Sequence, residues 1–348
     1  MGIFRNFLVV SIFLIALVIV FYNIPGATPD IKSPNAIALL EPWIVNDAEQ
    51  WVLIRGKNKE NPVLLFLHGG AGSPDMPFHH SSGQNLEDDF VVVRWDQRGA
   101  GKSFDPYMPD KSFTVEQFVD DACELSLLLR ERLSARKIYI VGHSWGTVLG
   151  VLAARQCPEN YFAYVGVGQV VDYDRAPSVA YEQIKARADE ENDQKMLAKL
   201  AEIDLPLEGV DTILKFQKLR DSYGGEFYEP GTFWKYILAA FSNSPEYSLK
   251  DFIQYARGVE KTGELMWGKF KINFEETAIN FDMPVYFFSG IKDLNAPTDL
   301  VRDYVNVIVA PHKELIIFER SGHWPTFEEP EAFRKVLIDK LIKKHQPK

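Results

Sequence analysis

A serine between a buried strand and a helix is the feature that most constrains this chain. Residues 137–141 are β-branched and aromatic, a composition typical of a strand that is covered on both faces. Residues 142–146 read Gly-His-Ser-Trp-Gly and fit G-x-S-x-G, and residues 147–155 continue as a helix of small side chains. A serine in such a turn has a strained backbone and an exposed hydroxyl. The pattern predicts that Ser144 is a nucleophile and that the Trp145 amide, at the helix N-terminus, faces a developing oxyanion.

A second glycine-rich loop follows another predicted strand, at residues 63–67. Residues 68–72 read His-Gly-Gly-Ala-Gly. Glycines directly after a strand let the backbone approach a ligand closely, because no Cβ stands in the way. If this loop lies beside the nucleophile, it supplies the second oxyanion amide, which we assign to Gly70. A flexible turn without a chemical role is the alternative interpretation.

Asp293 and His323 also follow predicted strands, at residues 283–290 and 314–318. Parallel sheets place their sites beyond the carboxyl ends of their strands. The chain order serine, acid, histidine is that of the α/β-hydrolases and differs from the order in two other serine-hydrolase folds. We therefore predict a catalytic triad, in which His323 takes the proton of Ser144 and Asp293 holds the imidazole in the required tautomer.

Other polar residues near the predicted strand ends have less suitable settings. His143 precedes the nucleophile and is expected to point the wrong way along the turn, and His68 is expected to make a structural hydrogen bond. Residues 96–103 end in Gly-Ala-Gly-Lys-Ser, but Asp96 stands where a phosphate-binding loop requires glycine. Nucleotide binding is therefore rejected, and Asp96 and Arg98 are expected to brace this loop.

The composition excludes several other classes of function. The 348-residue chain has a formal net charge of −10 and no basic stripe, which argues against a nucleic-acid partner. Its two cysteines, Cys123 and Cys157, have no ligand histidines nearby, so no zinc site is predicted. Buried thiols are preferred to a disulfide. No cofactor and no metal are expected, and the sequence does not give the oligomeric state.

The amino-terminal residues favour a membrane anchor. Residues 6–29 carry no charged side chain, and about 18 apolar positions among them would span roughly 27 Å as a helix, close to the thickness of the hydrocarbon core. Arg5 precedes this segment, so the positive-inside rule places the remainder on the non-cytoplasmic side, periplasmic or extracellular. We predict that residues 1–25 form a single transmembrane helix. A cleaved signal peptide, which would make the protein secreted, is the alternative.

The remaining chain divides by its pattern of strands and helices. Residues 26–40 are expected to form a linker. Strands and helices alternate over residues 41–171 and again over 281–348, which predicts an α/β fold with a mostly parallel central sheet flanked by helices. Residues 172–280 contain amphipathic helical stretches, many aromatic residues and no evident buried strand. This block is predicted to be a helical cap, or lid, inserted over the site.

Three motifs together carry a resemblance to a known family. Residues 68–72, 96–103 and 142–146, in this order, resemble the proline iminopeptidase branch of the α/β-hydrolases, over about residues 45–340. The resemblance implies an α/β-hydrolase fold and a serine aminopeptidase that releases an N-terminal residue, often proline, from small peptides without a metal. It also implies acidic cap residues that hold the free amine of the substrate.

The chain also departs from this family. Ala71 stands where the family usually has proline, and His143 stands where it usually has glycine. Glu226 and Glu229, between cap helices, are the candidates for binding the amine. An iminopeptidase-like activity on small peptides is therefore the preferred hypothesis, and hydrolysis of carboxylesters or amides with small apolar acyl groups is the alternative. An inactive hydrolase fold used as a receptor is a third interpretation, and epoxide or haloalkane hydrolysis is disfavoured because Ser144 is not aspartate.

Overall fold

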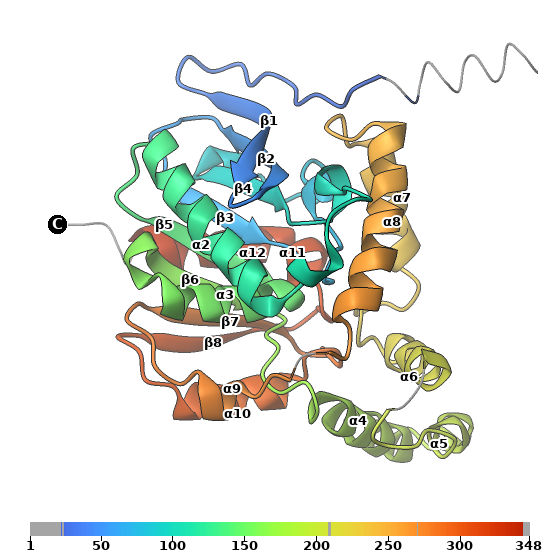
Figure 1. The fold of residues 1–348 in the computed structure, drawn as a ribbon. Coiled ribbons are helices and arrows are strands. Elements are labelled where there is room, and N and C mark those ends of the chain that lie inside the picture. Colours follow the sequence, from blue (N-terminus) through green and yellow to red (C-terminus); the bar gives the residue numbers. More distant parts are fainter. Residues whose placement is uncertain (1–21, 23, 208–209, 270, 344–348) are drawn as a thin grey trace, which may run out of the picture.

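One eight-stranded sheet forms the centre of the molecule (Figure 1). The computed structural model describes residues 22, 24–207, 210–269 and 271–343. The strand order is β1-β2-β4-β3-β5-β6-β7-β8. β2 pairs antiparallel with β1 and β4, and every other pair is parallel. The strands are β1 (Ile37–Val45), β2 (Ala48–Gly56), β3 (Val63–Leu67), β4 (Val91–Asp96), β5 (Ile138–His143), β6 (Tyr161–Val167), β7 (Val285–Gly290) and β8 (Lys313–Phe318).

The inner strands form where the sequence has short runs of β-branched and aromatic residues. Every residue of β3, β4, β5 and β7 is buried, as expected for strands with helices on both faces. The outermost hairpin differs from the prediction, because β1 begins at Ile37, inside the segment 26–40 that we expected to be a linker. Most of β1 is only partly buried at the sheet edge, so its residues lack the clear alternation that identifies a strand.

Helices cover both faces of the sheet. On one face, side chains of α2, α3, α9 and α10 pack in a large apolar cluster with the strands. On the other face, Phe333, Leu337 and Leu341 pack against β3, β5 and β7. These core helices are α2 (Val115–Arg132), α3 (Trp145–Gln156), α10 (Thr298–Val307), α11 (Pro325–Glu328), α12 (Pro330–Leu337) and the π-helix η6 (Ile338–Lys343). Short 3₁₀ turns are η1 (Met76–Phe78), η2 (Leu86–Asp88), η3 (Gly101–Ser103), η4 (Asp110–Ser112) and η5 (Pro158–Asn160).

The predicted fold class is therefore confirmed for the sheet and its flanking helices. The predicted membrane-spanning segment falls mainly on residues 1–21 and 23, which lie outside the described residues. In the part of the chain that the structure describes, no helix combines the length and the apolar character needed to cross a membrane.

The segment between β6 and β7 is helical. α7 and α8 run beside the carboxyl ends of the strands, whereas α4, α5 and α6 form a separate group below them in Figure 1. This group has its own apolar cluster, which includes Ile184, Leu200 and Phe216. The helices of the segment are α4 (Ala176–Glu190), α5 (Gln194–Leu200), α6 (Val210–Ser222), α7 (Phe233–Ser242), α8 (Leu249–Met266) and α9 (Phe274–Thr277).

The helical segment between β6 and β7, which we call the cap, leaves the core and returns to it at one place. Asp172 and Asn273 form an isolated antiparallel bridge. On either side of it, the Tyr173 amide donates to the Ile272 carbonyl at 3.0 Å, and the Phe274 amide donates to the Val171 carbonyl at 2.9 Å. The short helix α9, which begins at Phe274, packs with the core rather than with the cap.

The two cysteines are joined, so the prediction of buried thiols is wrong. Cys123 in α2 and Cys157 at the end of α3 form a disulfide with a Cα–Cα distance of 6.1 Å. The residues are 34 positions apart in the chain. The sequence pattern identified both helices but did not reveal that they pack side by side with these two positions facing each other.

We expect the disulfide to stabilise the core. Replacing both cysteines, Cys123→Ser with Cys157→Ser, should lower the free energy of unfolding by about 2–4 kcal/mol, because a closed loop of this length restricts the unfolded chain. Urea unfolding with and without a thiol reductant measures this difference. Reductant should weaken the parent protein and leave the double variant unchanged. Equal unfolding midpoints for the oxidised parent and the variant would contradict the expectation.

Candidate active site

The turn between β5 and α3 holds Ser144 in an unusual backbone conformation. Its φ of 52° and ψ of −118° lie in a region that costs a non-glycine residue about 1–3 kcal/mol. A Cβ on Gly142 would lie 2.3 Å from the Gly146 carbonyl oxygen, and one on Gly146 would lie 2.0 Å from that of Leu67. Gly142 therefore allows the turn to close on itself, and Gly146 allows it to press against the end of β3. The Ser144 amide is fixed by donating to the Val167 carbonyl at 3.0 Å.

The glycine loop after β3 lies directly beside this turn. A Cβ on Gly69 would be 3.3 Å from the Cβ of Ser144. Gly70 has a φ of 115°, and the peptide bond that follows it is cis. His68 anchors the loop, because its Nδ1 donates to the Gly69 carbonyl at 2.9 Å and its Nε2 accepts from the Gln97 amide at 3.2 Å. Burial lowers the pKa of His68 to about 4, so the ring is neutral and serves the expected structural role.

His323 and Asp293 meet beyond the ends of β8 and β7. The Nδ1 of His323 donates to Oδ2 of Asp293 at 2.8 Å, and both side chains are buried. The other carboxylate oxygen of Asp293 accepts from the amides of Asn295, at 2.9 Å, and Ala296, at 2.8 Å. The carboxylate is therefore fixed by its own loop, and it orients the imidazole.

The electrostatics of His323 result from two opposed effects. Burial lowers its pKa, whereas the charge and the hydrogen bond of Asp293 raise it, with a further contribution from Glu226. The pKa of His323 is raised overall above its usual 6.5. The hydrogen bonds of His323 within the described residues involve Nδ1, the amide and the carbonyl, and none joins Nε2 to Ser144 or to another described residue. That nitrogen is therefore available to exchange a proton.

Three further contacts hold His323 beside the turn of Ser144. Its amide donates to the Glu226 carbonyl at 2.8 Å, and its carbonyl accepts from Nε2 of His143 at 3.0 Å. A Cβ on Gly168, which has a φ of 57°, would lie 2.7 Å from the His323 ring. Because His143 precedes Ser144 and Gly168 follows the carbonyl that binds the Ser144 amide, the structure brings the predicted serine and histidine to one place.

His143 is therefore closer to the site than its position in the sequence indicated. Its ring centroid lies 4.9 Å from that of His323 and 4.0 Å from that of Trp324. Burial lowers the pKa of His143 well below 6.5, so the ring is neutral and can donate through Nε2. The expectation that it points away along the turn did not take account of the loop after β8 folding back over β5.

The two candidate cap carboxylates lie in different surroundings. Oε1 of Glu226 accepts from Nε1 of Trp324 at 2.5 Å, and Oε2 accepts from Nδ2 of Asn295. The side chain of Glu226 is half-buried next to His323, whereas that of Glu229 is exposed. The main-chain carbonyl of Glu229 accepts hydrogen bonds from Thr232. Glu226 is thus the candidate that the fold brings to the predicted triad.

Sequence reasoning did not single out the charged groups around Glu226. Burial raises the pKa of Asp221 to about 6 and that of Glu328 to about 7. Glu328 accepts from the amides of Tyr228, at 2.6 Å, and Gly322, at 2.7 Å, and so joins the cap to the loop of His323. Arg220 is the nearby cation, and burial lowers its pKa. Arg220 and Asp221 belong to α6 and Glu328 belongs to α11, and no motif joins them, so only the fold reveals the group.

Asp96 and Arg98 brace the loop after β4, as expected. Arg98 donates to Asp121 at 2.8 Å and to Asp47 at 2.7 Å. Oδ2 of Asp96 accepts from the Lys102 amide at 2.8 Å and from the Tyr247 hydroxyl. The second of these contacts ties the core to the cap segment just before α8.

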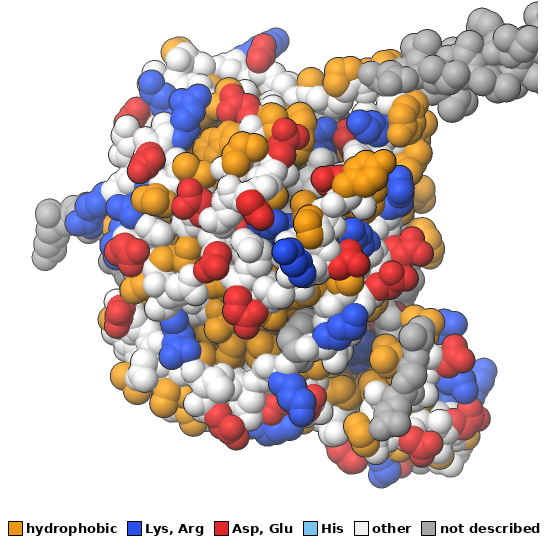
Figure 2. All heavy atoms as spheres, in the orientation of Figure 1, with side chains coloured by type: hydrophobic (Ala, Val, Ile, Leu, Met, Phe, Trp, Pro, Cys, Tyr) orange, Lys and Arg blue, Asp and Glu red, His pale blue; other side chains and the backbone are white. Residues whose placement is uncertain are grey.

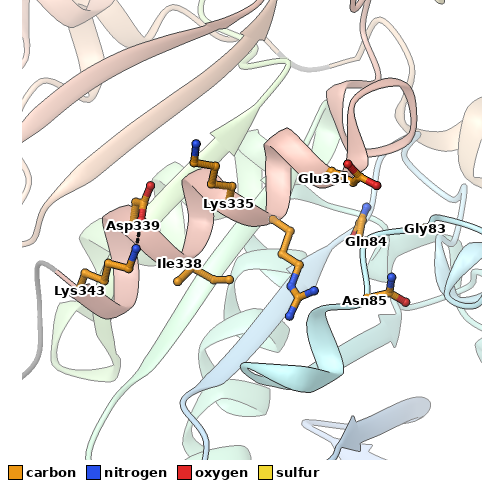
Figure 3. A pocket seen from close by; sticks show the side chains of 9 residues that line it. Gly83, Gln84, Asn85, Glu331, Lys335, Ile338, Asp339 and Lys343 are labelled. Atoms are coloured by element: carbon orange, nitrogen blue, oxygen red, sulfur yellow. Dashed lines mark hydrogen bonds and ion pairs between the residues drawn. The ribbon is translucent and has the colours of Figure 1, made fainter.

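A separate cavity of about 380 Å³ opens elsewhere, between α12 and the residues around Gln84 (Figure 3). Arg334 and the paired Asp339 and Lys343 line its other side. None of the predicted site residues contributes to it. Within the described residues, no group of three or more histidine, cysteine or acidic side chains is arranged to hold a metal ion.

Known proteins share both the sequence pattern and the fold. The family model described as the alpha/beta hydrolase fold matches residues 62–330. The "Probable aminopeptidase YbaC" of Bacillus subtilis (strain 168) is 28% identical over 313 residues, which are 88% of this chain and 97% of that protein. A "Proline iminopeptidase" of Heyndrickxia coagulans is 25% identical over 292 residues, which are 80% and 90% of the two chains.

Solved structures agree with this result. The crystal structure of proline iminopeptidase from Mycobacterium smegmatis has a TM-score of 0.62 and 18% sequence identity, and the match covers 88% of this chain and 98% of that one. The likeness of the structures supports the fold, and the family model covers more than half of the chain. The chain is therefore a hydrolase that belongs to the alpha/beta hydrolase fold family and resembles the proline iminopeptidases.

Proposed function

We propose that this hydrolase works through a Ser144–His323–Asp293 triad and an acyl-enzyme, and that it is an aminopeptidase on small peptides, similar to the proline iminopeptidases. The observation that carries the proposal is the 2.8 Å hydrogen bond from Nδ1 of His323 to Asp293, which leaves Nε2 on the side of the ring away from Asp293. That arrangement, beside a serine in a strained turn, is what proton transfer to a serine nucleophile requires.

In this mechanism Oγ of Ser144 attacks the carbonyl carbon of the scissile bond and its proton passes to Nε2 of His323. The resulting oxyanion accepts hydrogen bonds from the amides of Gly70 and Trp145, each of which would be worth about 3–4 kcal/mol in the transition state. His323 then gives the proton to the leaving amine as the C–N bond breaks. Water then attacks the acyl-enzyme and gives a proton to His323. The bond between the acyl carbon and Oγ breaks as His323 returns this proton to Ser144, which releases the acid.

Two observations favour peptides with a free amine as substrates. The relatives with matching length are named as aminopeptidases and proline iminopeptidases. In addition, the carboxylate of Glu226 lies next to His323, so an ammonium group bound there would be close to the nucleophile. A partly buried carboxylate is a suitable partner for a substrate cation, because its hydration has already been reduced.

One observation favours the alternative, hydrolysis of esters or amides with small apolar acyl groups. Both oxygens of Glu226 already accept hydrogen bonds, from Trp324 and Asn295, and Arg220 lies near enough to stabilise its charge. With Glu226 occupied in this way, the aromatic residues of the cap would bind the substrate instead. The same triad serves both reactions, so the fold does not distinguish them.

We also propose that residues 1–25 anchor the protein in a membrane, with the catalytic part on the non-cytoplasmic side, or that the protein is secreted if this segment is removed. The uncharged run that follows Arg5 supports the anchor. The Cys123–Cys157 disulfide supports the compartment, since disulfides persist in oxidising surroundings. Full-length protein should float with phospholipid vesicles in a density gradient, and protein that stays at the bottom would contradict the anchor.

The preferred reaction can be tested by comparing two chromogenic substrates. An N-terminal prolyl arylamide should be cleaved with a higher kcat/KM than a short-chain acyl ester, and Ser144→Ala should lower both rates by about 10⁴-fold or more. Turnover of the ester alone would discard the peptidase proposal. Unchanged hydrolysis by the Ser144→Ala variant, or no labelling by a serine-reactive phosphonate, would discard the catalytic assignment.

The role of Glu226 has its own matched pair of variants. Glu226→Gln should raise KM for the prolyl arylamide by about 10–100-fold, since the variant keeps the shape of the side chain and loses the charge that attracts the amine. Glu229→Gln, which changes an exposed carboxylate three residues further along the chain, should leave KM unchanged. The ester has no amine and controls for indirect effects on His323. Equal changes for both substrates would show that Glu226 does not bind the amine.

The contact of Gly168 with His323 predicts a further difference. Gly168→Ala should lower kcat by about 10²-fold or more, because the new Cβ would displace the imidazole and small misplacements of a catalytic group have large effects. Gly231→Ala is the control, since Gly231 also has a positive φ, of 86°, but a Cβ there would meet nothing within 4 Å. Both variants carry the strain of a positive φ, and Gly168→Ala should lose more thermal stability because only its Cβ meets another side chain. Equal activity of the two variants would refute the placement of His323.

A further inference from the structure

The cap exposes apolar side chains in one continuous area. In α7, Trp234, Leu238 and Phe241 follow one helical stripe, and the first two are each 67% exposed. Phe241 stacks on Phe252 of α8 at a centroid distance of 4.1 Å, so the ends of the two helices are joined. We call the exposed apolar area of these helices the outer cap face. It consists of Phe233, Trp234, Leu238, Phe241, Leu249 and Ile253.

The opposite face of α7 is apolar as well. Tyr236, Ile237 and Ala240 pack with Phe78 and Phe327, close to the loop of His323. A helix that is apolar all round is stable in a protein interior or in contact with lipid, and not with one face in water. Because the inner face of α7 is already covered by the protein, its outer face requires another partner.

The exposed charges within α7, the loop after it and the first turn of α8 have one sign. Between residues 232 and 253 the exposed charged side chains are those of Lys235 and Lys250. The two acidic residues of this stretch are buried, Glu246 against His80 at 2.8 Å and Asp251 against Lys102 at 2.8 Å. A chain with a net charge of −10 thus exposes only lysines between residues 232 and 253, and the exposed Glu229 precedes this stretch. Lysines that flank exposed aromatic and aliphatic side chains are typical of surfaces that meet anionic lipids.

The amino-terminal segment is attached to the same place. The Ala27 amide donates to the Pro245 carbonyl at 2.8 Å, and the Thr28 hydroxyl donates to the Glu246 carboxylate at 2.8 Å. Pro245 and Glu246 belong to the loop that joins α7 to α8. In Figure 1 the start of the described chain runs along the end of these helices, and Figure 2 shows hydrophobic side chains gathered over the same edge. The uncharged run of residues 6–29 therefore leads directly to the outer cap face.

We propose that the outer cap face lies in the headgroup region of the bilayer to which residues 1–25 anchor the protein. The apolar side chains enter the boundary of the acyl chains, Trp234 lies at the level of the headgroups, and Lys235 and Lys250 meet lipid phosphates. α7 then lies between the bilayer and the Trp324–Phe327 segment, so the cap faces the membrane. This inference relies on the proposed anchor and does not depend on whether the substrate is a peptide or an ester.

Tryptophan quenching by brominated lipids tests the proposal on the full-length chain. The first tryptophan is Trp43, so the anchor itself contributes no signal. The protein is reconstituted into phosphatidylethanolamine–phosphatidylglycerol vesicles with and without brominated acyl chains. Trp234→Phe should remove most of the quenching seen in the parent protein. Trp267→Phe should retain it, because Trp267 is also exposed, at 54%, but follows the far end of α8, roughly 27 Å from Leu249.

The outcomes separate the two proposals. Protein that floats with the vesicles but loses equal quenching in both variants, or shows none, retains its anchor and refutes the outer cap face as a membrane surface. Protein that does not float refutes both. Shielding of Trp234 without lipid, together with a dimer in sedimentation, would show that a second copy of the chain covers the face and would overturn the proposal. Phenylalanine keeps the apolar character of either position, so both variants should fold.

Discussion

The hydrogen bond between His323 and Asp293 is the interaction on which the candidate site depends. This bond orients the imidazole because other contacts also fix the main chain and the ring of His323. Its amide is held by Glu226 of the cap, its carbonyl by His143 of β5, and its ring lies against Gly168. Each contact comes from a different part of the chain, so the position of the imidazole depends on the packing of the sheet and of the cap. A loop of five residues after β8 could not hold the ring in this way by itself.

Local pattern was sufficient to find the residues at the strand ends. Ser144, Asp293 and His323 were predicted because each follows a run of buried strand residues, and the parallel sheet then brings such positions to one edge. The tight turn between β5 and α3 was predicted from its two glycines, which is also a local pattern. The sheet, its flanking helices and the helical segment between β6 and β7 follow from periodicity, which depends on neighbours within one or two turns.

Features that depend on contacts between distant elements could not be predicted. The pairing of Cys123 with Cys157 requires knowledge of how α2 packs on α3. The support that His143 gives to His323 joins residues 180 positions apart. Glu328 looks like an ordinary helix-end carboxylate in the sequence, and its role in binding two loop amides appears only in the fold. The first residues of β1, 37–40, were assigned to the linker because an edge strand is only partly buried and lacks a clear alternation of apolar and polar residues.

The bridge between Asp172 and Asn273 has a consequence for how this molecule could change over time. About a hundred residues enter and leave the core through two adjacent backbone positions, and the strands on either side, β6 and β7, pair with each other without help from the intervening segment. Such an insertion can be lengthened, shortened or replaced while the register of the sheet stays intact. The inserted helices can therefore change in evolution independently of the residues at the strand ends.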